Sequence, residues 1–514
     1  MSTKKCLFGM AVFAIIAMGF TACSQVLSPE ESSVTVQLPG ESGGRAYTEA
    51  EKSGFAYTVT LTGPGGRTVT AEASAGKAVT FGGLVKGLWL VEVRALNGDK
   101  ESVAYGSDTV TVTAGNNRAL VKMGEIIYSL TQLKGAIDDA KAGDTLYIGS
   151  DIEFTGFIEI LKNLTFSSLG DYTLSRGSAH PNELFQIGSE TVTFKAEGTN
   201  TLTLDGKSNP NIKKPLISLN SGATLVLGNG SVLQNNEVVV SDPLGVSGGA
   251  VYCKNGKVVV SGGIIRDNIN LANNKEGGGF YLEDSEFTMT SGAIYGNTAE
   301  TGGGLHLINS GFTMTGGEIY GNTANTTSAG RGGGVYIKNT GLSAGDPARI
   351  ITISGGSVYG NHTFANGGGF YIDNSGRAQD AVVISGGAIY NNIVAGSSGA
   401  GGGIRLNNSA KFTMSGGAVY RNQADEGGGM YVTNVSSFTM TGGHICRNLL
   451  SGGGTTGGGL YIASSTISIP SPKKGEIKEN SSQNVRLDYG VTGDTTGIAV
   501  GGENGESDIC SMAH

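Results

Sequence analysis

Apolar and polar residues alternate with a period of two along most of this chain, which predicts β-strands that bury one face. From Gly248 onward the alternation recurs in units of about 25 to 35 residues, each opened by a cluster of glycines. Apolar residues stand one and three places after each cluster, as Phe280 and Leu282 do. A second strand follows, such as 287–289, with two large apolar groups inward and a threonine outward. After a glycine pair, a third short strand ends in asparagine.

Three short strands per unit describe one coil of a right-handed parallel β-helix, a solenoid that resembles the pectin-lyase-like fold. We assign residues 144–480 to this all-β solenoid. About eleven coils, stacked about 4.8 Å apart, predict a rod about 50 Å long. Leucine-rich repeats fit less well because their helical segment is absent, and propellers because they need four strands per unit.

The asparagines that close the units would align into a ladder, in which each amide bonds to its neighbour or caps its turn. We expect this role to be structural. The ladder positions from Gly248 onward are Asn268, Asn297, Asn322, Asn361, Asn392, Asn422, Asn448 and Asn480, and Asn235 closes an earlier, less regular coil.

Two further elements precede the solenoid. Residues 34–124 alternate at period two between glycine-rich turns, which predicts a small antiparallel β-sandwich that resembles immunoglobulin-like or transthyretin-like spacers of bacterial surface proteins. Residues 125–143 contain the one segment with helical spacing, at Leu130, Leu133 and Ile137, with Gly143 just past its end. We expect this helix to cap the first coil, whose apolar end would otherwise face water.

The first residues of the chain predict export and a lipid anchor. Lys4 and Lys5 precede an apolar stretch that is too short to span a bilayer comfortably. Residues 20–23, Phe-Thr-Ala-Cys, then resemble a bacterial lipobox, although phenylalanine replaces the usual leucine. The resemblance implies a signal peptide at 1–22, a lipidated Cys23 and a tether at 23–33; ordinary secretory cleavage or an uncleaved anchor is the alternative.

Composition narrows the function. Glycine supplies 87 of 514 residues, against a usual share of about 7%, which favours short strands and tight turns over helical bundles. The net charge of -8 argues against a nucleic-acid partner. The cysteines that follow Cys23 are too scattered for a disulfide framework, and Cys253 stands at a position that is apolar in other units. The five histidines are scattered too, so we expect no metal site and no cofactor.

Tyrosines recur at two outward positions of the units. Outward aromatic rows can contact sugars or a partner protein, or they can stack on one another and stiffen the sheet. Both interpretations stay open. The candidate ligand-contact residues are Tyr281, Tyr336 and Tyr371 on the first strand, and Tyr295, Tyr320, Tyr359, Tyr390 and Tyr420 on the third.

The glycine clusters followed by an apolar residue and tyrosine, together with the Ile/Val-Tyr-x-Asn strands, resemble the repeats of chlamydial polymorphic outer-membrane proteins. That resemblance implies adhesion or contact with a host surface. The polar, glycine-rich tail at 481–514 offers no strands suited to a membrane barrel, so lipid on Cys23 is the expected attachment. We therefore expect a surface-exposed outer-membrane lipoprotein that binds a glycan or protein ligand; a periplasm-facing or secreted location, and a role as an envelope spacer, are alternatives.

A polysaccharide lyase or hydrolase of the pectin-lyase-like type is the other functional hypothesis. The sequence lacks the paired aspartates and the basic motifs of pectinase-type hydrolases. Its nearest acidic cluster is Glu276 with Glu300, with Arg331 one coil on, and solvated loop charges explain that cluster equally simply. We assign no catalytic residue.

Overall fold

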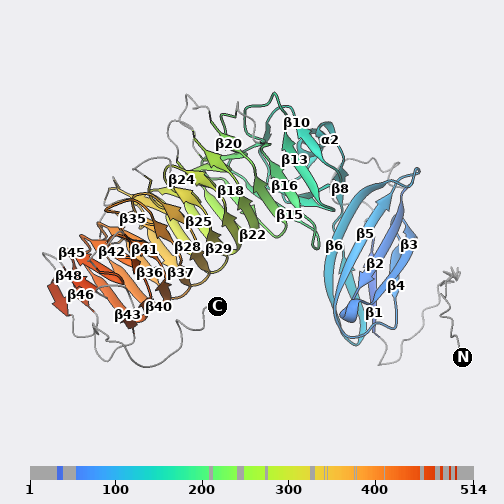
Figure 1. Ribbon diagram of the computed structural model, residues 1–514. Helices are drawn as coiled ribbons and strands as arrows, with labels where there is room; N and C mark the ends of the chain where they lie inside the picture. The colour runs from blue at the N-terminus through green and yellow to red at the C-terminus, as the bar shows by residue number, and fades with distance from the viewer. Residues whose placement is uncertain are drawn as a thin grey trace, which may run out of the picture.

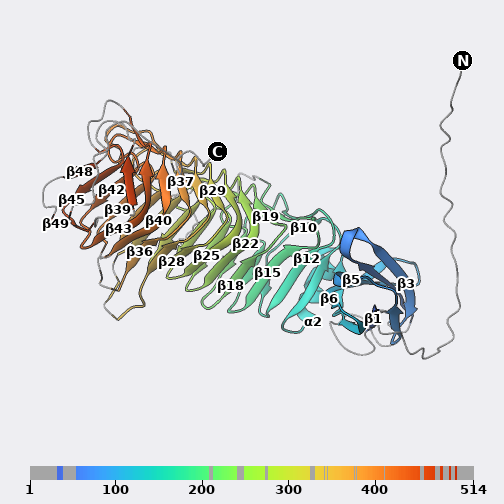
Figure 2. The ribbon, with the colours of Figure 1, turned by 90° about the horizontal axis from the view of Figure 1, so that it is seen from below.

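A computed structural model describes residues 32–38, 54–207, 212–239, 248–271, 276–324, 330–340, 342–343, 345–374, 377, 379–409, 411–451, 457–468, 475–478, 485–487 and 492–494. It shows a β-sandwich followed by a right-handed parallel β-helix, as the sequence predicts (Figures 1 and 2). Cys23, Asn480 and most of the predicted tail at 481–514 lie outside the described residues. Two segments of that tail, 485–487 and 492–494, are strands that pair with the solenoid, so the solenoid extends past residue 480.

The sandwich consists of two sheets that enclose one apolar core around Trp89. In the smaller sheet, β1 pairs antiparallel with β4 and parallel with β7. In the larger, β2 lies between β3 and β5, and β5 pairs with β6. The elements are β1 (Ser32–Gln37), β2 (Ala56–Thr62), the short 3-10 helix η1 (Pro64–Gly66), β3 (Thr68–Ser74), β4 (Ala78–Phe81), β5 (Gly87–Leu96), β6 (Ser102–Val112) and β7 (Gly115–Leu120).

Strand β8 (Gly124–Ile127) joins the two domains through hydrogen bonds. It pairs antiparallel with β6 of the sandwich and parallel with β9 (Asp144–Ile148) of the solenoid. The chain then forms α2 (Leu130–Asp139), where the Ser129 hydroxyl accepts from the backbone N–H of Gln132 at the N-terminus. Leu133 and Ile137 of α2 belong to the solenoid core, so the helix covers the start of that core.

The solenoid has three sheets, which we call sheets I, II and III. Sheet I has twelve parallel strands: β11 (Ile158–Ile160), β14 (Phe185–Ile187), β17 (Ile217–Leu219), β21 (Val251–Lys254), β24 (Phe280–Glu283), β27 (Leu305–Ile308), β31 (Val335–Asn339), β35 (Phe370–Asn374), β39 (Ile404–Asn407), β42 (Met430–Thr433), β45 (Leu460–Ala463) and β48 (Val485–Leu487).

Sheet II contains the second and third strands of each predicted unit, which follow each other end to end across one broad face and merge into one long strand in coils such as that of β25. After β9, its strands are β10 (Ile152–Phe154), β12 (Leu164–Ser168), β13 (Tyr172–Arg176), β15 (Thr191–Ala196), β16 (Leu202–Asp205), β18 (Thr224–Leu227), β19 (Ser231–Gln234), β22 (Lys257–Arg266), β25 (Glu286–Tyr295), β28 (Gly311–Met314), β29 (Glu318–Tyr320), β32 (Ile350–Ile353), β33 (Ser357–Tyr359), β36 (Ala381–Ile384), β37 (Ala388–Tyr390), β40 (Phe412–Tyr420), β43 (Phe438–Cys446), β46 (Thr466–Ser468), β47 (Gly475–Lys478) and β49 (Thr492–Asp494).

Sheet III has eight two-residue strands, which the sequence patterns do not reveal. They follow the closing asparagines and give most coils a third side. They are β20 (Glu237–Val238), β23 (Ile269–Asn270), β26 (Thr298–Ala299), β30 (Thr323–Ala324), β34 (His362–Thr363), β38 (Ile393–Val394), β41 (Gln423–Ala424) and β44 (Leu449–Leu450).

The asparagine ladder forms as predicted. From Asn268 to Asn448, each Nδ2 donates to the Oδ1 of the next asparagine at 2.9–3.0 Å, and all of these side chains are buried. The ladder begins one residue later than predicted, at Asn236 rather than Asn235, because Asn235 takes the left-handed turn with φ of 55°. There the guanidinium of Arg176 donates from Nη2 to Asn236 Oδ1 at 3.0 Å, so a buried arginine supplies the first donor.

Candidate binding face

The eight candidate tyrosines fall on two separate ladders. Tyr281, Tyr336 and Tyr371 lie on the outer side of sheet I, and the other five lie on the outer side of sheet II. None belongs to the main core of the solenoid, so their outward orientation is confirmed. The structure therefore divides the eight candidate tyrosines between two surfaces, the outer sides of sheets I and II, which differ in exposure to solvent.

The sheet I ladder is closed to solvent over several coils. His306 stacks between Tyr281 and Tyr336, with centroid distances of 5.3 and 4.5 Å, and Tyr336 stacks on Tyr371 at 5.1 Å. Further along, the guanidinium of Arg405 lies 4.0 Å over Tyr431. Tyr336 and Tyr371 are only 7% and 6% exposed, so their placement gives a ligand little access.

His306 is the most confined member of this ladder. Its Nδ1 lies 2.9 Å from the Thr301 hydroxyl, and its Nε2 has no hydrogen-bond partner among the described residues. Complete burial lowers its pKa to about 3, which keeps the ring neutral. The imidazole therefore serves as an uncharged ring between two tyrosines.

The sheet II ladder is regular and more open. Consecutive rings from Tyr295 to Tyr420 lie 4.8–4.9 Å apart with interplanar angles of 6–10°. Because each ring covers the face of the next, a sugar cannot stack on the inner rings; ring edges and phenolic oxygens are what the ladder presents. Tyr420, at 4% exposed, closes one end against Cys446, which is disulfide-bonded. The structure thus shows that these tyrosine rings stack on one another. Contact between the ladder and a ligand stays a prediction, and the inner rings could make it only through their edges and phenolic oxygens.

A row of threonine and valine residues, which ends in a serine, runs beside this ladder on the same sheet. Its members are in register from coil to coil, half-buried, and none carries a charge. We call it the central row: Thr165, Thr193, Val226, Val259, Thr288, Thr313, Thr352, Val383, Thr413, Thr439 and Ser468.

A second row lies two residues further along the strands. All of its side chains carry hydroxyls, and five of the six are exposed. We call it the outer row: Thr290, Thr315, Ser354, Ser385, Ser415 and Thr441. The two rows together are the threonine face, and within the part of the chain that the structure describes, none of their hydroxyls between Thr288 and Thr441 has a hydrogen-bond partner.

The sequence contains the signal for this face, because a threonine stands between the inward Phe and Met of several units. The alternation along the strand predicts only that this threonine points outward. The outer row, the pairing of equivalent residues over successive coils and the absence of hydrogen-bond partners for the hydroxyls become visible only in the structure.

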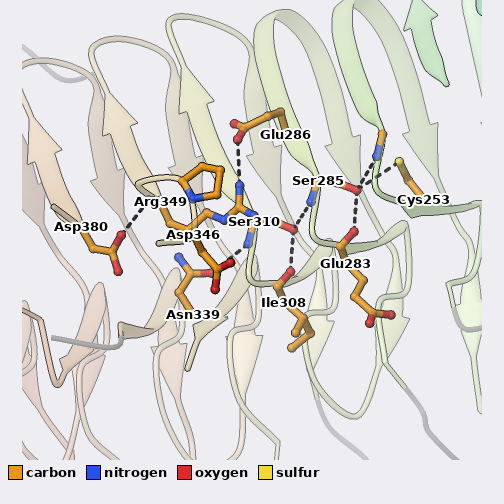
Figure 3. A network of polar contacts seen from close by, with 12 residues as sticks. Cys253, Glu283, Ser285, Glu286, Ile308, Ser310, Asn339, Asp346, Arg349 and Asp380 are labelled. Carbon is orange, nitrogen blue, oxygen red and sulfur yellow. Dashed lines mark hydrogen bonds and ion pairs between the residues drawn. The ribbon is translucent and has the colours of Figure 1, made fainter. Parts of the chain in front are cut away.

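The corner between sheets I and II is held by internal polar contacts (Figure 3). The Ser285 hydroxyl donates to Glu283 O at 2.7 Å, and the backbone N–H of Ser285 donates to the Ser310 hydroxyl at 3.0 Å. The backbone N–H of Ser310 in turn donates to Asn339 Oδ1 at 2.9 Å. These hydroxyls are used inside the fold, in contrast to those of the threonine face.

Charged residues lie at this corner, at the margin of the face. Arg349 reaches Glu286 at 3.4 Å, and its backbone N–H donates to Asp380 Oδ1 at 2.8 Å (Figure 3). Asp380 is fully buried and receives a two-pronged contact from Arg377. These pairs fix the turn that leads into the central row.

The acidic residues considered for catalysis lie on neighbouring coils, as the sequence predicts. Glu276 is bridged to Thr301 of the next coil, and Arg331 lies one coil beyond Thr301. Burial raises the pKa of Glu276, while Lys338 lowers it. Among the described residues, no three His, Cys, Asp or Glu side chains gather as a metal site would require.

Within the described ranges, the structure contains no helix that is both long and apolar enough to cross a bilayer. Comparisons with protein-family models, with curated proteins and with solved structures found no match for this chain. The fold and the threonine face define the class of the protein: a right-handed parallel β-helix whose outer surface carries two extended rows of uncharged, mostly hydroxyl-bearing side chains.

Proposed function

We propose that this protein is a surface-displayed, outer-membrane lipoprotein whose β-helix is a non-enzymatic binding or adhesive module for a glycan or a neighbouring surface. The observation that carries the proposal is the threonine face, a repeated array of free hydroxyls on a rigid sheet. Hydroxyls that point outward without internal partners are available to a ligand.

Rigidity supports a binding role. The inward neighbours of the central row, such as Phe287, Phe312 and Phe412, are at most 1% exposed, and the asparagine ladder ties successive coils together. A surface that is already ordered loses little conformational entropy when it binds. Lipid on Cys23 would hold the module at the membrane, and the sandwich would act as a spacer.

Two measurements on the full-length lipoprotein test this proposal. Externally added protease should cleave the protein on intact cells, and the purified protein should bind a glycan array or intact cells. Protection of the protein on intact cells would contradict surface display. Absence of binding to every array glycan and to cells would contradict the binding role, and release of sugar fragments from a bound polysaccharide would replace it with an enzymatic one.

A further inference from the structure

We infer that the threonine face takes an ordered, uncharged polysaccharide, bound along the rod as an extended or packed array of chains. This inference rests on the proposed binding function and names both its surface and its ligand class. Three observations lead to it: the threonine face is periodic, its two rows carry no charge, and the inner rings of the tyrosine ladder beside it are covered by one another.

Periodicity favours a polymer. Neighbouring coils hold equivalent residues about 4.8 Å apart, and residues i and i+2 of one strand lie about 6.6 Å apart. Thr288 and Thr290 of β25 thus begin a grid of hydroxyls that reaches Thr439 and Thr441 of β43. Within it, the central row is interrupted at Val383 and the outer row has a register shift at Ser415. A single hydroxyl contact contributes little because water competes for it, so useful affinity requires many simultaneous contacts. A ligand that repeats its own hydroxyls can supply them.

Neutrality narrows the ligand further. The central row has no charged side chain from Thr165 to Ser468, and the outer row has none from Thr290 to Thr441. Directly beside the central row, exposed Lys257 pairs in register with exposed Glu286, so a polyanion or a polycation would meet charges of both signs there and no row of opposite charge. Protein partners are also disfavoured, because protein interfaces draw their binding energy mainly from Trp, Tyr and Arg and seldom from Ser or Thr.

The tyrosine ladder beside the face favours an ordered ligand over a short soluble sugar. Its inner ring faces are covered by neighbouring rings, as with Tyr359 between Tyr320 and Tyr390. A single sugar would therefore gain no stacking contact there. Chains already fixed in parallel lose less entropy on binding than a flexible oligosaccharide does.

The inference is tested by depletion of the full-length protein from solution by insoluble polysaccharides. The uncharged probes are microcrystalline cellulose, chitin and an insoluble β-1,3-glucan, and the charged probes are cross-linked polygalacturonate and chitosan. We expect binding to at least one uncharged probe, weak binding to both charged ones, and little change when the NaCl concentration is raised about tenfold. Soluble oligosaccharides of the same sugar should not compete at equal sugar concentration.

A conservative variant tests the hydroxyls themselves. Thr313→Val/Thr352→Val removes two hydroxyls but keeps a shape that Val259 and Val383 already supply in the row. Its matched control is Thr298→Val/Thr323→Val, the same change at neighbouring positions of sheet III. We expect the first variant to bind the polysaccharide several-fold more weakly and the control to bind as wild type does.

Three outcomes would overturn the inference: no uncharged probe binds, a charged probe binds more tightly, or both valine variants bind equally. If one of these occurs while the protein still binds cells or array glycans, only the inference falls. If the protein binds nothing at all, the proposed function falls with it.

Discussion

The rings of Tyr320 and Tyr359 lie nearly parallel, with centroids 4.9 Å apart and an interplanar angle of 6°. These residues stand 39 positions apart in sequence and are direct neighbours in the sheet because successive coils pair in register. The contact decides what this surface can offer a ligand. Rings that cover each other present edges, so the free hydroxyls of the adjacent threonine face become the main binding groups.

The two tyrosine ladders, on sheets I and II, should make the protein sensitive to alkali. Burial, and next the carboxylate of Glu318, raises the pKa of Tyr359 from 10.0 to about 12, and burial raises that of Tyr336 likewise. Because the folded-state pKa values lie above the unfolded value, the stability they contribute is complete below about pH 10 and lost as pH rises towards about 12. Thermal melting across this range should show the loss, and tyrosine absorbance should titrate late. Titration at the unperturbed pKa of 10.0 would contradict the stacked arrangement.

His306 should produce an acid-side loss of stability. Burial lowers its pKa from 6.5 to about 3, so its contribution is complete above pH 6.5 and disappears as pH falls towards 3. The variant His306→Tyr, which copies Tyr281 and Tyr336 in the neighbouring coils, should reduce this loss. Melting temperatures from pH 7 to pH 3 measure the effect, and parallel acid profiles of variant and wild type would show that His306 is not the responsible group.

The asparagine ladder should be sensitive to single substitutions. Asn392→Ala leaves the buried backbone N–H of Asn361 without its acceptor, which costs about 1–3 kcal/mol. It also removes one of the two acceptors of the Asn361 Nδ2, which keeps only the carbonyl of Ile319. The adjacent change Asn391→Gly is the control, since Asn391 is exposed with φ of 52° and a glycine, Gly360, fills the equivalent position one coil earlier. The midpoint of urea unfolding should fall clearly for the first variant and little for the second. Equal midpoints would mean that the ladder does not stabilise the coils.

Lipidation at Cys23 is a prediction of the sequence alone. Cells that express the protein should incorporate a labelled fatty acid into it, and Cys23→Ala should abolish the label and release the protein from the membrane fraction. Label that persists in the alanine variant would place the lipid elsewhere. No label in the wild-type protein would mean that Cys23 carries no lipid.

Much of the solenoid could be predicted because its residues follow a strict period. Phe287, Phe312 and Met314 fall where alternation places them, and each occupies the core. The two-residue strands of sheet III, such as Thr298–Ala299, are too short for periodicity to show. Arg176 could not be assigned to the asparagine ladder either, because its partner Asn236 is 60 residues away.

The candidate site was predictable only in part, for a physical reason. Whether a side chain points inward or outward follows from its place in the strand, but its exposure to solvent depends on the side chains of the neighbouring coils. Tyr295 and Tyr336 are both outward, yet the first is half-buried and the second is almost fully covered. The threonine face shows the same limit, since its free hydroxyls emerge only when the coils are placed in register.

The central claim is that the outer side of sheet II is the contact surface. The most direct test is the ratio of the dissociation constants of two double variants for the cells or glycan surface that the wild-type protein binds. Thr313→Lys/Thr352→Lys places two charges on the threonine face, and Thr298→Lys/Thr323→Lys places the same two charges on sheet III. We predict that the first variant binds at least about tenfold more weakly than the second, which is a difference of about 1.4 kcal/mol. If both variants fold and their dissociation constants are equal, the threonine face is not the contact surface.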